Sequence, residues 1–188
     1  MITERYPPPS EAVLGCIAEL DVARAGSRKS RRELGDPTRL ERPWEPAECS
    51  PELRHDIWCW LEEVAGWINR QHVWRPERSI PPCWPEHPHL ANELAVVACE
   101  RLAAGRATGV GNLEAWQHHT LPRFLDRIAS ELGTGCLPGR HTEWPAAARY
   151  RAFTDPAAVE RRQRAFNTDA ATLPLDYLGV AAAQAATS

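Results

Sequence analysis

Apolar side chains recur every three or four residues near the middle of the chain, which is the spacing of one face of a helix. Ser50 offers an N-cap, and Pro51 supplies a first-turn residue whose φ is already close to the helical value. The pattern therefore predicts a helix over residues 51–70. Its inward face comprises Leu53, Ile57, Trp60, Leu61, Val64, Trp67 and Ile68.

Two further helices are predicted after a loop, residues 71–88, that contains five prolines. Pro88 begins a helix that ends near Gly105, and Asn112 caps a third that runs to Leu132. Pro122 removes a backbone donor inside the third helix, so we expect a kink or a break there. The inward positions are Leu90, Leu94, Val97, Ala98 and Leu102 in the second helix, and Leu113, Trp116, Thr120, Leu121, Phe124, Leu125, Ile128 and Leu132 in the third.

The flanks are poorer in apolar residues than this middle part. A helix is predicted over residues 10–26. Residues 24–42, which overlap its end, carry seven cations and three anions and are expected to form a mobile linker. Asp155 and Pro156 begin a short helix that runs to Phe166, and the Ala-rich end from Thr168 is expected to be frayed or disordered. We therefore expect an N-terminal helix and basic linker (1–49), a helical core domain (50–141), and a short helix with a flexible tail (142–188).

The fold class expected is all-α, a small bundle of three main helices with an extra N-terminal helix and flexible flanks. No stretch alternates apolar and polar residues for long enough to predict a strand. The formal net charge is −3, no apolar run is long enough to span a bilayer, and the first residues lack the pattern of a signal peptide. We therefore expect a cytoplasmic protein without a membrane partner.

Two short motifs that contain tryptophan suggest a relationship to other proteins. They are Trp84-x-x-His87-Pro88 and Trp116-x-x-His119-x-x-Pro122, with Cys136 and His141 following. The region of roughly residues 55–141 resembles a family of uncharacterised small helical domains of actinobacterial plasmids, prophages and integrative conjugative elements. The use of 21 Arg against one Lys is similar to what a GC-rich genome encodes. The resemblance implies a cytoplasmic, mobile-element setting and no mechanism.

Two Cys/His pairs have the spacing of metal ligands. Cys83 and His87 lie in the Pro-rich loop, and Cys136 and His141 follow the last core helix. In a reducing cytosol the six cysteines are expected to be thiols, and zinc favours four such sulfur and nitrogen donors in a tetrahedron. If the two loops meet, zinc is the candidate cofactor. The alternative is that Cys83 is a small buried side chain, that His87 caps the next helix, and that Cys136 and His141 belong to an exposed tail.

No set of catalytic residues is recognisable. Glu114 and His118 share a helix face, but the His-Glu-x-x-His pattern of helical metalloproteases is absent and a solvated ion pair is the simpler interpretation. His119 is a candidate hydrogen-bond donor to the loop around Trp84. Gly109 and Gly111 precede a helix without the lysine of a phosphate loop, which favours a plain turn. An enzyme is therefore less favoured than a non-catalytic protein.

Two kinds of binding surface are candidates. Trp58 points away from the first core face and Trp74 lies in a loop, so both are candidates for a protein interface, although they could instead cover the ends of the bundle. Phosphate contacts are the other candidate use of the linker, through Arg28, Lys29, Arg31 and Arg32, although a solvated linker is the simpler interpretation.

The leading hypothesis from sequence is a non-catalytic helical accessory protein of an actinobacterial mobile element, which acts by protein contact. The alternatives are a nucleic-acid-binding module that uses the basic linker, and a zinc-stabilised or metal-dependent protein that uses Cys83, His87, Cys136 and His141.

Overall fold

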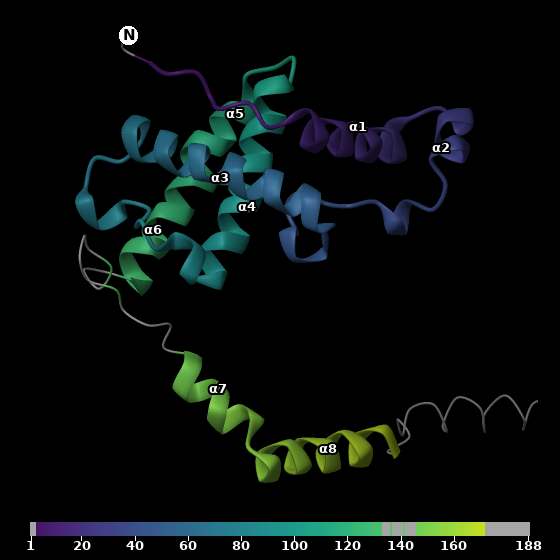
Figure 1. Cartoon of the computed structure of the whole chain (residues 1–188), viewed down its shortest axis with the longest axis vertical. Coiled ribbons are helices and arrows are strands. Elements are labelled where there is room, and N and C mark those ends of the chain that lie inside the picture. The colour runs from purple at the N-terminus through teal and green to yellow at the C-terminus, as the bar shows by residue number, and fades with distance from the viewer. Residues whose placement is uncertain (1–2, 133–135, 137–140, 142–145, 172–188) are drawn as a thin grey trace, which may run out of the picture. The chain divides into compact units, whose positions relative to one another are not determined.

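A computed structural model describes residues 3–132, 136, 141 and 146–171 (Figure 1). The fold within these residues is all-helical, with no strand. None of the described helices combines the length and the apolar composition needed to cross a bilayer. The chain divides into two compact units, Met1–Thr142 and Glu143–Ser188, which are described separately below.

Three helices carry most of the core of the first unit. They are α3 (Pro51–Gln71), α4 (Pro88–Arg106) and α6 (Leu121–Glu131), and α4 packs against both of the others (Figure 1). The two helices predicted over 51–70 and 88–105 are confirmed to within one residue at each end. Their predicted apolar faces are largely buried, because covering these faces removes the most apolar surface from water.

The third predicted helix is interrupted where its proline requires it. α5 (Gly111–Ala115) leads into a π-helical turn over Trp116–Thr120, and α6 begins at Leu121. The backbone N–H of Leu121 donates to the carbonyl of Trp116, five residues earlier. Pro122 has no N–H to continue the α-helical pattern, so the wider turn carries the chain past it. The expected interruption is therefore a π-helical turn within a nearly continuous helical segment.

The N-terminal segment contributes to the same core. α1 (Glu11–Ala25) is capped by Ser10, whose hydroxyl accepts from the N–H of Val13, and Val13 is fully buried. Ahead of α1 the chain lies along α3, where the indole N–H of Trp60 donates to the carbonyl of Pro7 and that of Trp67 to the carbonyl of Glu4. These indoles thus hold residues 4–7 against the core, a role that apolar periodicity did not reveal.

Part of the expected basic linker is helical. Residues Arg28–Leu34 form α2, because Ser27 caps it by accepting from the N–H of Ser30. α2 ends at Leu34, and the next residue, Gly35, has a φ of 83° that is unfavourable for any residue with a Cβ. The expectation of a mobile linker over residues 24–42 did not include this short helix, because its charged residues give no apolar periodicity.

The second unit contains α7 (Ala146–Thr154) and α8 (Pro156–Ala171). The Arg162 guanidinium lies 3.9 Å from the centre of the Phe153 ring and donates to the Phe153 carbonyl at 2.7 Å. The short helix expected from 155 to 166 is therefore longer than predicted, and α7 was not predicted. The tail expected to be flexible lies largely, from residue 172, outside the described residues.

An arginine is enclosed by aromatic rings in the first unit. The Arg101 guanidinium lies 5.0 Å from the ring centre of Tyr6, 5.7 Å from that of Trp67 and 5.6 Å from that of Trp116. Burial lowers the pKa of Arg101 from its ordinary value, although far too little to remove its charge at neutral pH. The ring faces are negative, so they offset part of the cost of taking this charge out of water.

The imidazole of His72 lies beside this cluster, and its pKa predicts a contribution to the pH dependence of stability. Burial, and then the nearby Arg101 charge, lower the pKa below its usual 6.5. Its ring lies 4.7 Å from that of Trp67, and its buried Nε2 has no hydrogen-bond partner among the described residues. As the pH falls below 6.5, the unfolded chain binds a proton that folded His72 resists, so stability should decrease.

The substitution His72→Phe should therefore flatten the pH dependence of unfolding between pH 7.5 and about 5. Urea unfolding of both proteins at the two pH values measures it, and His55→Phe is the control because His55 is exposed. An unchanged dependence in His72→Phe would show that His72 is freely protonated in the folded state.

Candidate metal centre

The loop before α4 is held in place by three side-chain contacts. Asn69 on α3 donates to the carbonyl of Ile80 and accepts from its N–H, both at 2.9 Å. Trp84 is buried, and its indole N–H donates to Glu62 at 2.9 Å. Cys83 and His87 flank the short 3-10 turn of Trp84–Glu86, so both are fixed at the start of α4.

The other two predicted ligands come from the segment after α6. Cys136 is buried, and the side chain of His141 is 34% exposed and lies against the loop before α4. The His87 and His141 ring centres are 5.2 Å apart. The two loops therefore meet, as the sequence interpretation of a metal site requires.

One donor atom from each of the four residues lies within 4.8 Å of the other three. His87 is at the centre of the set: its Nε2 is 3.4 Å from the Cys83 Sγ and 3.3 Å from the Cys136 Sγ. Around zinc, with sulfur at 2.3 Å and nitrogen near 2.1 Å, the edges of the tetrahedron are about 3.4–3.8 Å. The closest pairs match these edges, and the widest pair needs to approach by about 1 Å.

The donor set favours zinc over harder cations. Two thiols and two imidazoles are soft or borderline ligands, whereas calcium and magnesium select oxygen ligands. The structure gives no carboxylate among the four. Four protein donors also complete a tetrahedral shell, which is the arrangement of structural zinc sites.

Burial favours the neutral forms of Cys83 and His87 when no cation is bound, because it shifts the pKa of each group. It is the main cause that raises the pKa of Cys83 to about 11, and the neighbouring Cys136 thiol adds to the effect. Burial also lowers the pKa of His87, with His141 and His89 as further causes. A bound dication reverses this preference at the sulfurs, because a coordinated thiol loses its proton.

Neighbouring groups indicate which ring nitrogen of His141 is available to a metal, and the environment of Nδ1 can be described for His87. The Glu86 carboxylate lies 3.3 Å from Nε2 of His141, which leaves Nδ1 of that ring as the nitrogen available to a metal. Metal-bound histidines commonly engage a carboxylate through their other nitrogen, and Glu86 has this position. Nδ1 of His87 is buried and has no hydrogen-bond partner among the described residues. Sequence reasoning missed Glu86, because its position next to His87 gives no indication of the contact.

The alternative roles considered for these residues are seen only in part, since Cys83 is half-buried and His141 is exposed. His87 occupies the N-cap position of α4, but its side chain makes no capping hydrogen bond. Cys136 is buried and does not lie in an exposed tail. All six cysteines of the chain are free thiols, as expected.

The two candidate interface tryptophans are in different environments. Trp58 is half-buried, with its ring centre 5.9 Å from that of Trp84, whereas Trp74 is 96% exposed. Trp58 lies within α3 and Trp74 follows its end, so about 20 Å of helix axis separates them. They therefore do not form one compact patch.

The other candidate residues are exposed. The predicted phosphate contacts Arg28, Lys29, Arg31 and Arg32 are on α2, which buries no residue, and Lys29 lies 3.9 Å from Glu33. Within the described part of the chain, Glu114 makes no ion pair with His118. Exposed His119 likewise donates no hydrogen bond to the Trp84 loop.

Comparisons give no relative for this chain. No family model, curated protein or solved structure matches it. The resemblance to helical domains of actinobacterial mobile elements stays a prediction, and the functional argument therefore depends on the site geometry.

Proposed function

We propose that this chain is a non-catalytic, zinc-stabilised helical protein. The observation that carries the proposal is the convergence of Cys83, His87, Cys136 and His141, whose donor atoms lie within 4.8 Å of one another. One metal ion would bind the loop before α4 to the segment after α6. The loop before α4 contains only short 3-10 turns, so a metal crosslink would help to hold it on a small core.

A structural role for the metal is favoured over a catalytic one. Catalytic zinc sites keep a position open for water or substrate, and they commonly have three protein ligands. Here four protein donors fill the shell, and two of them, His87 and Cys136, are buried.

The cellular role that we propose is that of an accessory protein that works by protein contact, in the setting of an actinobacterial mobile element. The sequence resemblance and the absence of a recognisable catalytic set support this role. Trp74 is its best-placed contact residue, because its indole is almost fully exposed. A fully exposed tryptophan offers a large apolar surface to a partner.

Metal content of the full chain tests the zinc proposal. Protein purified without chelator and without added metal should contain one zinc ion per chain, measured by mass spectrometry under native conditions. Cys136→Ser should reduce this content to near zero because it removes a buried thiolate ligand. Cys59→Ser is the matched control, since Cys59 is exposed and outside the cluster. Zinc-free wild-type protein that also fails to take up added zinc would overturn the proposal.

A further inference from the structure

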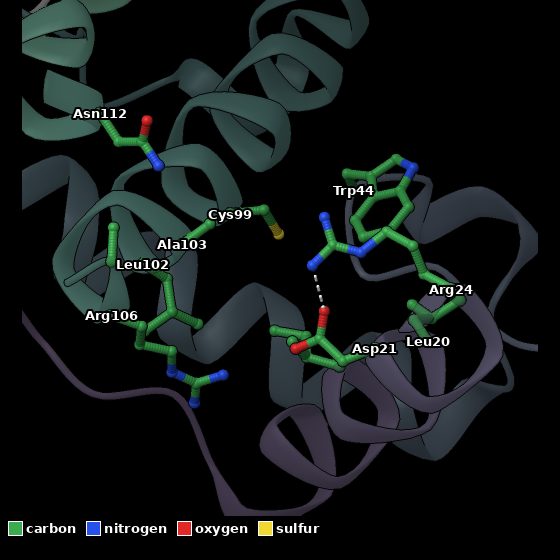
Figure 2. A pocket seen from close by; sticks show the side chains of 11 residues that line it. Leu20, Asp21, Arg24, Trp44, Cys99, Leu102, Ala103, Arg106 and Asn112 are labelled. Carbon is green, nitrogen blue, oxygen red and sulfur yellow. Dashed lines mark hydrogen bonds and ion pairs between the residues drawn. The ribbon is translucent and has the colours of Figure 1, made fainter. Parts of the chain in front are cut away.

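A hollow of about 580 Å³ lies between α1 and the end of α4, away from the cysteine–histidine cluster (Figure 2). Its volume is within the range of about 300–1,000 Å³ that is typical of small-molecule sites. The apolar wall is formed by Ile17 and Leu20 of α1, Leu102 of α4 and the indole of Trp44. Protein interiors are otherwise close-packed, so an open apolar hollow of this size is available to a ligand.

Two features restrain the walls of the hollow in the absence of a ligand. Trp44 lies between Pro43 and Pro46, both fully buried, so its backbone position is restrained. The Cys16 thiol of α1 donates to the carbonyl of Glu41 at 2.8 Å, which ties α1 to the segment that carries Trp44. A preformed wall lowers the ordering cost of binding.

The charged groups at the rim leave one positive charge without a partner. Arg24 and Asp21 form an ion pair at 2.9 Å, so their charges largely cancel. Arg106 lines the same hollow and makes no ion pair or hydrogen bond with any described residue. Figure 2 shows Arg106 near Leu102 at one side of the hollow and Arg24 near Trp44 at the other side.

The thiol of Cys99 points into the space between these walls (Figure 2). Burial raises its pKa to about 12, so the group is an uncharged, weakly polar thiol at neutral pH. It therefore places no negative charge near Arg106, and the net charge of the lining is +1.

We infer that this hollow binds a small amphipathic carboxylate, with an aliphatic body against Leu20, Leu102 and Trp44 and its carboxylate paired with Arg106. The apolar lining accounts for the body of the ligand. A single unpaired guanidinium matches one carboxylate in charge and offers it two parallel donors. A phosphate monoester would bring nearly two negative charges to a rim with one net positive charge. The inference is independent of the proposed zinc site.

Calorimetric titration of the full chain with decanoate tests this inference. Decanol, decylammonium and decyl phosphate are the comparison ligands, because they keep the body and change the head group. Decanoate should bind at least about tenfold more tightly than each of them, and Arg106→Gln should weaken decanoate binding by about tenfold. Arg123→Gln is the matched control, because Arg123 is exposed on α6 and outside the hollow.

A second variant blocks the hollow without removing charge. Ala103 lines it and is exposed, so Ala103→Phe should place a ring in the space, abolish decanoate binding and leave the unfolding midpoint nearly unchanged. Absence of decanoate binding at millimolar concentration would overturn the inference. Binding that does not distinguish the head groups, or that survives both Arg106→Gln and Ala103→Phe, would overturn it as well.

Discussion

Removal of zinc with a chelator is expected to lower the thermal unfolding midpoint of the full chain by roughly 10 °C. A ligand that binds only the folded state at about 1,000 times its dissociation constant stabilises that state by about 4 kcal/mol. For a chain of this size, each kcal/mol shifts the midpoint by about 2–4 °C. The affected contacts join the loop at His87 to Cys136 and His141, whereas the packing of α3 on α4 involves no ligand side chain. We therefore expect loss of stability with retention of helical circular dichroism.

Two cysteine variants distinguish a specific site from a general effect of the chelator. Cys59→Ser should show the wild-type response, because Cys59 is exposed and outside the cluster. Cys136→Ser should already have the lowered midpoint and should not respond to chelator. Equal midpoints for wild type with and without chelator, after zinc loading, would contradict a stabilising metal.

Truncation of one buried tryptophan should destabilise the chain by about 3–5 kcal/mol. In Trp67→Ala the lost ring is 4% exposed, and its centre lies 5.1 Å from that of Tyr6 and 6.2 Å from that of Trp116. The change also removes the indole donor to the Glu4 carbonyl and one of the three rings around Arg101. Both a cavity and a poorly compensated, half-buried cation should result. Urea unfolding followed by circular dichroism measures the loss.

Trp74→Ala is the matched control for this prediction, because it removes the same side chain from a site that is 96% exposed. Its cost should be within about 0.5 kcal/mol of zero. Similar costs for the two variants would mean that the aromatic cluster around Arg101 does not stabilise the folded state.

The regular parts of the fold were predictable because they depend on local signals. The α3 helix follows from its apolar spacing and from Pro51 at its start, and the α4 helix follows from Pro88. Pro122 likewise predicted an interruption, although a missing N–H alone does not specify a π-helical turn. α7 was missed because its nine residues carry no strong apolar face.

Contacts between distant residues were not predictable from the periodicity. The segment around Tyr6 is short and Pro-rich, and its attachment depends on indole donors more than 50 residues away. Arg101 was also unrecognised, since a charged residue on a helix is expected to face solvent unless its neighbours in space are known. Three rings from separate elements determine its position.

The four candidate ligands could be nominated from sequence because each pair has a short spacing. The sequence could not show that the two pairs lie close together in space, since this depends on how α4 and α6 pack and on where the chain goes after α6. The pairing of His141 with Glu86 required the same knowledge. The basic residues of α2 had an equally suggestive sequence pattern, and in the structure they lie exposed on a helix that buries no residue.

X-ray absorption spectroscopy at the zinc edge of the metal-loaded full chain tests the central claim most directly. The account predicts a four-coordinate shell of two sulfurs near 2.3 Å and two nitrogens at about 2.0–2.1 Å. A shell of oxygen and nitrogen atoms alone, without sulfur, would contradict it.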